Sequence, residues 1–133
     1  MIVLSNTTEQ TLQPGQSINF DEVVMAAGTC ECHRRNTGSV KMRSNGIYEV
    51  SFHGNIGGET AATPVQLALT LGTSPLLETT MISVPAAVTD RNNVGASTRI
   101  RNCCGDYDRV SVTNTGTVPV VVAANSSFIV ERA

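Results

Sequence analysis

The chain has 133 residues, of which 41% are hydrophobic and 15% charged, and its formal net charge is -2. This length suits one domain with a core of its own, and the charge excludes a basic surface for nucleic acid. No apolar run is long enough for membrane insertion.

Short apolar stretches alternate with turn residues along the whole chain, a pattern typical of an all-β sandwich or barrel. No stretch has the apolar spacing of an amphipathic helix. The strands expected in chain order are residues 2–4, 17–24, 40–43, 47–55, 65–71, 76–84, 97–101, 109–113, 118–123 and 127–131. Residues 90–94 are expected to form a polar loop.

The clearest strand signal lies in residues 46–52. Tyr48, Val50 and Phe52 fall on one face of an extended chain, and Glu49 and Ser51 fall on the other. Residues 65–71 alternate in the same way. Each pattern predicts a strand with one face in a core.

Five motifs follow one another in a characteristic order: Ile18-Asn-Phe20 with Val23-Val24, Gly46-Ile-Tyr48-Glu-Val-Ser-Phe52, residues 65–72, Gly105-Asp106-Tyr-Asp-Arg-Val110-Ser-Val112, and Ser127-Phe128-Ile-Val-Glu-Arg132. In this order they resemble the C1q/TNF-like jelly roll of the bacterial and phage type, including the head domain of collagen-like spore-surface proteins. The resemblance implies a ten-stranded antiparallel sandwich that forms a homotrimer. It covers residues 15–133 and leaves residues 1–14 as an N-terminal arm with a short strand.

The same resemblance implies which apolar side chains build the core or the trimer contacts. They are Phe20, Tyr48, Val50, Phe52, Val110, Val112, Phe128 and Val130.

A second group of motifs is similar to short phage and prophage proteins of gut bacteria: Cys30-Glu-Cys-His33, Gly54-Asn-Ile-Gly-Gly58, Glu78-Thr-Thr-Met-Ile-Ser83, Asn102-Cys-Cys-Gly105 and Asn114-Thr-Gly-Thr-Val-Pro119. This similarity implies a virion component such as a head fibre, a decoration protein or a tail-fibre tip. The N-terminal residues have neither the positive charge nor the long apolar run of a signal peptide. We therefore expect release by lysis and a place on a virion or a cell surface.

The cysteines form two groups, which the implied jelly roll places at the same end of the barrel. Cys30, Cys32 and His33 would then approach Cys103 and Cys104. Three states are open: a zinc site, disulfides between the groups, and free or buried thiols.

Other candidate sites have weaker patterns. Asp90, Asp106 and Asp108 are either calcium ligands or turn residues. His53 and Ser51 lack the surrounding motif of a catalytic nucleophile and its base, so we expect no enzyme. No cofactor is expected, with zinc and calcium as the alternatives.

The function expected from these features is the display of loops, such as residues 57–63 and 89–96, to host-surface glycans. Two alternatives remain: a capsid-cementing protein without a ligand, whose first ten residues dock on other virion proteins, and a bacterial surface module of the same fold.

Overall fold

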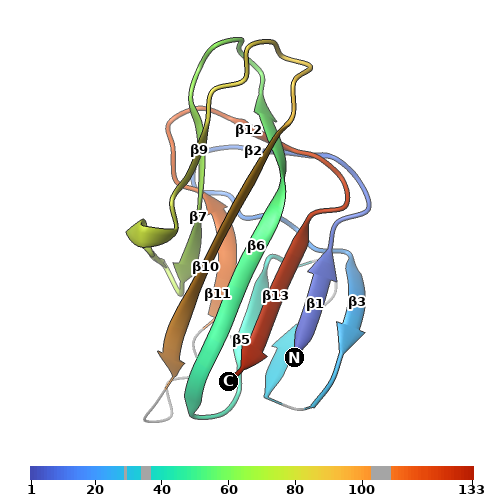
Figure 1. Cartoon of the computed structure of the whole chain (residues 1–133), viewed down its shortest axis with the longest axis vertical. Coiled ribbons are helices and arrows are strands. Elements are labelled where there is room, and N and C mark those ends of the chain that lie inside the picture. The colour runs from blue at the N-terminus through green and yellow to red at the C-terminus, as the bar shows by residue number, and fades with distance from the viewer. Residues whose placement is uncertain (29, 34–36, 103–108) are drawn as a thin grey trace.

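The computed structural model describes residues 1–28, 30–33, 37–102 and 109–133. Two antiparallel sheets, built from thirteen strands, pack face to face (Figure 1). The all-β sandwich expected from the sequence is confirmed. The strand number exceeds ten because of three short strands. β2 (Gln10–Leu12) and β8 (Ser74–Pro75) were not expected, and β4 (Glu31–His33) lies in residues 26–38, whose sequence indicates either a loop or a weak strand.

The larger sheet is organised around its longest strand, β6 (Gly46–Gly58). On one edge β6 pairs with β10 (Asn92–Asn102) over residues 46–56. On its other edge it pairs with β13 (Ser127–Arg132) and then with β12 (Val120–Val122), which in turn pairs with β2. Beyond β13 the sheet continues through β1 (Ile2–Ser5) to its edge strand β3 (Glu22–Ala26).

The smaller sheet has β11 (Arg109–Asn114) near its middle. β11 pairs with β5 (Ser39–Met42) on one side and with β7 (Val65–Leu71) on the other. β4 extends this sheet beyond β5, and β8 and β9 (Met81–Ser83) pair with β7. The described part of the chain holds no helix of the length and apolarity that a membrane crossing requires.

The alternation predicted for β6 is confirmed. Tyr48, Val50 and Phe52 are at most 1% exposed, whereas Glu49 is exposed. The Tyr48 hydroxyl is also buried, and it lies within hydrogen-bond distance of the carbonyl oxygens of Ser44 (2.9 Å) and Cys30 (3.2 Å), to which its one hydrogen can be donated. A buried phenol with partners adds specificity to the core without an unsatisfied polar group.

The structure places the eight predicted core or trimer residues inside a single chain, where each is at most 1% exposed. The rings of Phe20 and Phe128 stack between the sheets with their centroids 5.2 Å apart. Because these side chains are already covered by their own chain, any contact between subunits must use other residues.

Residues 1–14 are part of the sandwich rather than an arm in front of it. β1 lies between β13 and β3, and Ile2 and Leu4 are 5% and 0% exposed. Leu12 of β2 is also buried. Three strand pairings hold this part of the chain: β1 with β13, β1 with β3, and β2 with β12.

Three expected segments differ in the structure. Of residues 17–24, expected as one strand, only residues 22–24 belong to β3, and Ser17 and Phe20 form isolated bridges with Thr113 and Thr37. Residues 76–84, expected as one strand, contain a 3₁₀ turn, η1 (Leu77–Thr79), followed by β9. At the turn, the Thr79 hydroxyl and not a backbone carbonyl accepts from the Leu69 amide of β7 (2.9 Å). The same hydroxyl donates to the Leu76 carbonyl (2.6 Å). Residues 92–94, expected in a loop, belong to β10, because β6 supplies their backbone partners.

A buried asparagine joins the N-terminal segment to the turn before β13. Asn6 is 0% exposed, and its Nδ2 donates to the carbonyl oxygens of Thr8 and Ala123, both at 3.0 Å. Its Oδ1 accepts from the amide (3.1 Å) and the hydroxyl of Ser126. All the hydrogen-bonding capacity of this amide is therefore used inside the protein.

Both chain ends meet one buried carboxylate. Glu31, whose side chain is 1% exposed, accepts from the Met1 ammonium and from the Arg132 amide, each at 2.9 Å. The two termini consequently lie close together at one end of the molecule (Figure 1).

Candidate functional site

One face of the larger sheet is not covered by any other element among the described residues. Side chains that alternate with the buried ones point to this face, and cross-strand partners share it. One row of partners runs across the sheet from β3 to β10. We call this surface the open face and define it by Val3, Met25, Glu49, Ser51, Ser97, Arg99 and Ile129.

The open face is apolar at the β3 side. Val3 pairs with Met25 on one neighbouring strand and with Ile129 on the other, so these three side chains are adjacent. Met25 is 48% exposed, and its neighbours Val23 and Val24 are 44% and 59% exposed. Among the strands that the structure describes, β3 pairs only with β1, which leaves its other edge free. An apolar edge strand of this kind favours association with another chain.

Towards β10 the open face is polar. Arg99 donates to Glu49 Oε1 from Nε (3.0 Å) and Nη2 (2.7 Å), and both side chains are at least half exposed. Next to this pair lies a shallow hollow of about 420 Å³ between β6 and β10. The exposed ion pair adds little to stability, but it gives the face a fixed pattern of charge.

Two loops meet at the end of the sandwich away from the termini (Figure 1). They are residues 59–64 and 84–91, because Gly57 and Gly58 belong to β6 and residues 92–96 to β10. The Ala62 amide donates to the Pro85 carbonyl (2.8 Å), which joins the two loops. Gly57 permits their packing, since a Cβ there would lie 2.4 Å from the Asp90 carbonyl oxygen.

Arg91 fixes the second loop. Its Nη1 donates to the carbonyl oxygens of Val88 and Asp90, both at 2.9 Å, and its Nε and Nη2 each contact the Glu9 carboxylate at 3.2 Å. The Arg91 side chain thus forms hydrogen bonds both within its own loop and to Glu9 in the segment before β2.

Replacing Arg91 with alanine is expected to speed amide hydrogen exchange in residues 84–91, because four side-chain hydrogen bonds are lost. The free energy of unfolding should fall by no more than about 1 kcal/mol, since the contacts are at the surface. Arg101→Ala, at an exposed position of β10, is the control and should leave the loop protected. Unchanged exchange in Arg91→Ala would show that the loop is held by other contacts.

The predicted cysteine cluster falls partly outside the described residues, since Cys103 and Cys104 lie there. Cys30 packs against the core, Cys32 is exposed, and both are free thiols. His33 Nδ1 lies 2.9 Å from the Ser39 carbonyl oxygen and Nε2 lies 3.2 Å from that of Phe20. Both ring nitrogens therefore lie within hydrogen-bond distance of backbone carbonyl oxygens.

Within the described ranges, no three His, Cys, Asp or Glu side chains gather as a metal site requires. Asp90 acts as a turn residue, with its Oδ2 accepting from the Ala87 amide (3.1 Å). Asp106 and Asp108 lie outside the described residues. His53 is exposed on β6, where its strand neighbours are Gly95 and Ser127.

Sequence reasoning missed the apolar part of the open face. Val3, Met25 and Ile129 become neighbours only through strand pairing, and Met25 lies just beyond the strand expected over residues 17–24. The signal present was the run Val23-Val24-Met25, in which every residue is exposed. A strand exposed on both faces has the same apolar sequence as a strand buried on both faces, so the run alone does not separate them.

The architecture defines a jelly-roll sandwich, and comparison with solved structures makes the class more specific. The globular domain of zebrafish complement 1qA matches with TM-score 0.68 and 14% identity, over 96% of this chain and 94% of that one. The TNF protein Eiger of S. frugiperda matches with TM-score 0.73 and 14% identity, over 99% and 91%. The PRD1 vertex protein P5 matches with TM-score 0.52 and 17% identity, over 98% and 96%.

The chain therefore has the C1q/TNF-like jelly-roll fold. No family model matches its sequence, and no curated protein sequence matches it. At these identities the likeness describes the fold alone.

Proposed function

We propose that this chain is a non-enzymatic structural or adhesive domain that forms a homotrimer in a phage virion, as a head fibre, a decoration protein or a tail-fibre tip. The likeness to C1q and TNF domains supports self-association, and the likeness to the PRD1 vertex protein supports a place on a particle. Host-surface glycans and other virion proteins are the proposed partners.

The observation that carries self-association is the open face. A sheet with apolar side chains at its edge and a fixed ion pair further across suits a specific contact with another copy of the chain. The opposite face, on the smaller sheet, carries hydroxyl groups instead: Thr70, Ser111 and Thr113 point outwards there.

Display follows from the position of the loops. Residues 59–64 and 84–91 are joined to each other and held by Arg91 at the end far from the termini. Three copies around one axis would present three such loop pairs in the same direction. Weak contacts with repeated surface glycans would then add up through avidity.

Replacing Ile129 with lysine tests the proposed interface. The wild type is expected to have three times the 14.0 kDa chain mass by light scattering, and Ile129→Lys to have the mass of one chain. The reason is that a lysine at this half-buried position stays solvated in a single chain but would be desolvated in the assembly. Thermal unfolding of the single chain should change little.

Ile82→Lys is the matched control, because Ile82 is 60% exposed on β9 of the smaller sheet. It should keep the mass of the wild type. Met25→Lys provides a second variant at the exposed edge in case Ile129→Lys fails to fold. A wild type with the mass of one chain would overturn the proposal, and a trimer that survives both substitutions would place the interface elsewhere.

Adhesion and cementing are separated by two binding measurements on the same trimer. Binding to immobilised host glycans supports adhesion, and binding to particles that lack the protein, without any glycan binding, supports cementing. Chains without either activity would contradict the proposed role.

A further inference from the structure

A hollow of about 460 Å³ lies on the outer face of the smaller sheet, which is the sheet opposite the open face. Its floor carries four hydroxyl groups: Ser17, Thr70, Ser111 and Thr113. Thr70 and Ser111 are paired across β7 and β11, and Ser17 is bridged to Thr113. We call this site the hydroxyl hollow.

The floor is partly connected by its own hydrogen bonds. Ser17 Oγ lies 2.9 Å from Thr113 Oγ1, which lies 3.4 Å from Ser111 Oγ. Thr70 is different: it is 6% exposed, and its Oγ1 has no hydrogen-bond partner among the described residues. A buried hydroxyl without a partner is unfavourable, so a ligand group that reaches Thr70 from the hollow would relieve this cost.

The rim of the hollow is preformed. The Gly15 amide donates to the Asn114 carbonyl (2.8 Å), and the Gly72 amide donates to the Arg109 carbonyl (2.7 Å). The side chain of Asn114 holds the adjoining turn by accepting from the Gly116 amide (2.9 Å). A rim held in this way loses little conformational entropy when a ligand binds.

The chemistry of the lining selects the ligand. Among the described residues, all the side chains that line the hollow are uncharged, so an ionic ligand would lose its hydration without meeting an opposite charge from them. Hydroxyl groups both donate and accept, which matches a ligand that is itself rich in hydroxyl groups. Pro75 provides an apolar wall for the C–H face of a sugar ring.

We propose that the hydroxyl hollow binds an uncharged saccharide unit, with Thr70 as the hydroxyl that acquires a partner on binding. The site lies within one chain and away from the open face. It names a ligand class for the proposed adhesive role, yet it would remain in place if the chain were a monomer.

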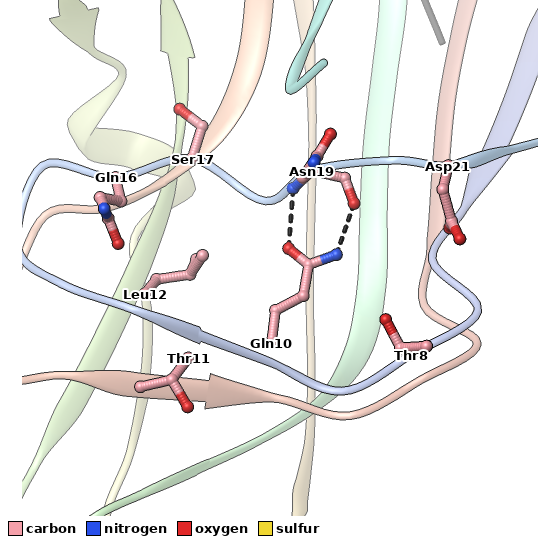
Figure 2. A pocket seen from close by; sticks show the side chains of 8 residues that line it. All are labelled: Thr8, Gln10, Thr11, Leu12, Gln16, Ser17, Asn19 and Asp21. Carbon is pink, nitrogen blue, oxygen red and sulfur yellow. Dashed lines mark hydrogen bonds between the residues drawn. The ribbon is translucent and has the colours of Figure 1, made fainter. Parts of the chain in front are cut away.

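A larger hollow nearby is less suited to this role. It has a volume of about 620 Å³, and Figure 2 shows its lining. There the Gln10 side chain already bonds to the backbone of Asn19, with Oε1 accepting from the amide at 2.9 Å and Nε2 donating to the carbonyl. The Asp21 carboxylate accepts from the amide and the hydroxyl of Thr7. These groups have partners without a ligand.

The test is an NMR titration of the isotope-labelled protein with D-glucose and D-galactose in the millimolar range. At least one of these sugars is expected to shift the amide signals of Gly15, Thr70, Gly72 and Gly116 saturably. D-glucuronate should bind at least about tenfold more weakly, because none of the described residues that line the hollow is a cation.

Thr70→Val separates binding from structure, because it removes the unpaired hydroxyl and keeps the shape of the side chain. We expect the saccharide to bind about tenfold more weakly while the melting temperature stays equal or rises. Thr11→Val, in the hollow of Figure 2, is the matched control and should leave binding unchanged.

The proposal is overturned if neither sugar gives saturable shifts, if Thr70→Val binds as the wild type does, or if the shifts map to the Figure 2 hollow. Equal binding of glucuronate would overturn the uncharged ligand class. Because the titration reads a single subunit, a trimer without sugar binding contradicts only this inference, and a sugar-binding monomer contradicts only the proposed assembly.

Discussion

Deleting residues 1–13 is expected to leave the chain unfolded. The deletion removes β1 from between β13 and β3 and takes β2 away from β12. It also removes the buried side chains of Ile2, Leu4 and Leu12, each of which contributes about 1.5–3 kcal/mol by burial. Together with the lost strand pairings, this loss is comparable to the whole free energy of unfolding of a domain of this size, which is about 5–15 kcal/mol.

Circular dichroism and thermal melting of the truncated chain measure this effect. Thr8→Ala, at an exposed position of the same segment, is the control and should melt as the wild type does. A truncated chain with a cooperative melt would contradict the expectation. The result also matters for function, because lost capsid binding after this deletion would report unfolding and not the loss of a docking arm.

Replacing Asn6 with aspartate is expected to lower the free energy of unfolding by at least about 3 kcal/mol. The substitution keeps the shape of the side chain but puts a carboxylate oxygen where Nδ2 now donates to the carbonyl oxygens of Thr8 and Ala123. Two acceptors lose their donor, and a negative charge is buried in a site that is 0% exposed.

Chemical denaturation gives the size of the change. Asn93→Asp is the matched control, because Asn93 is exposed on β10, and it should alter stability by no more than about 0.5 kcal/mol. Equal stability of the two variants would show that the hydrogen bonds of Asn6 contribute no more than those of a surface amide.

The strands that could be predicted are those whose pattern is set by a single buried face. β6 alternates from Tyr48 to Phe52 because one side lies in the core and the other side does not. β7 was predicted from the same pattern, although Ala68 and Thr70 on its other side are also buried. Residues 76–84 misled the prediction because Leu77, Ile82 and Val84 are apolar yet more than half exposed. Their apolar composition indicated a buried strand, but the Leu69 amide of β7 donates to the Thr79 hydroxyl and not to a backbone carbonyl of a neighbouring strand.

The candidate sites were less accessible from the sequence because they depend on contacts between distant segments. Asn6 meets Ser126 across 120 positions, and the hydroxyls of Ser17 and Thr113 meet across 96. Nothing in the local sequence distinguishes these residues from ordinary turn and strand residues. Only the pairing of the sheets shows which of them come together.

Because both termini contact Glu31, they lie at one end of the domain, opposite the end that carries the two loops. Whatever is joined to either end of the chain, whether a neighbouring protein, a tag or a solid support, attaches at one pole. The two loops held by Arg91 point from the other pole. Attachment through either terminus should therefore give the molecule the same orientation, in which the two loops point away from the point of attachment.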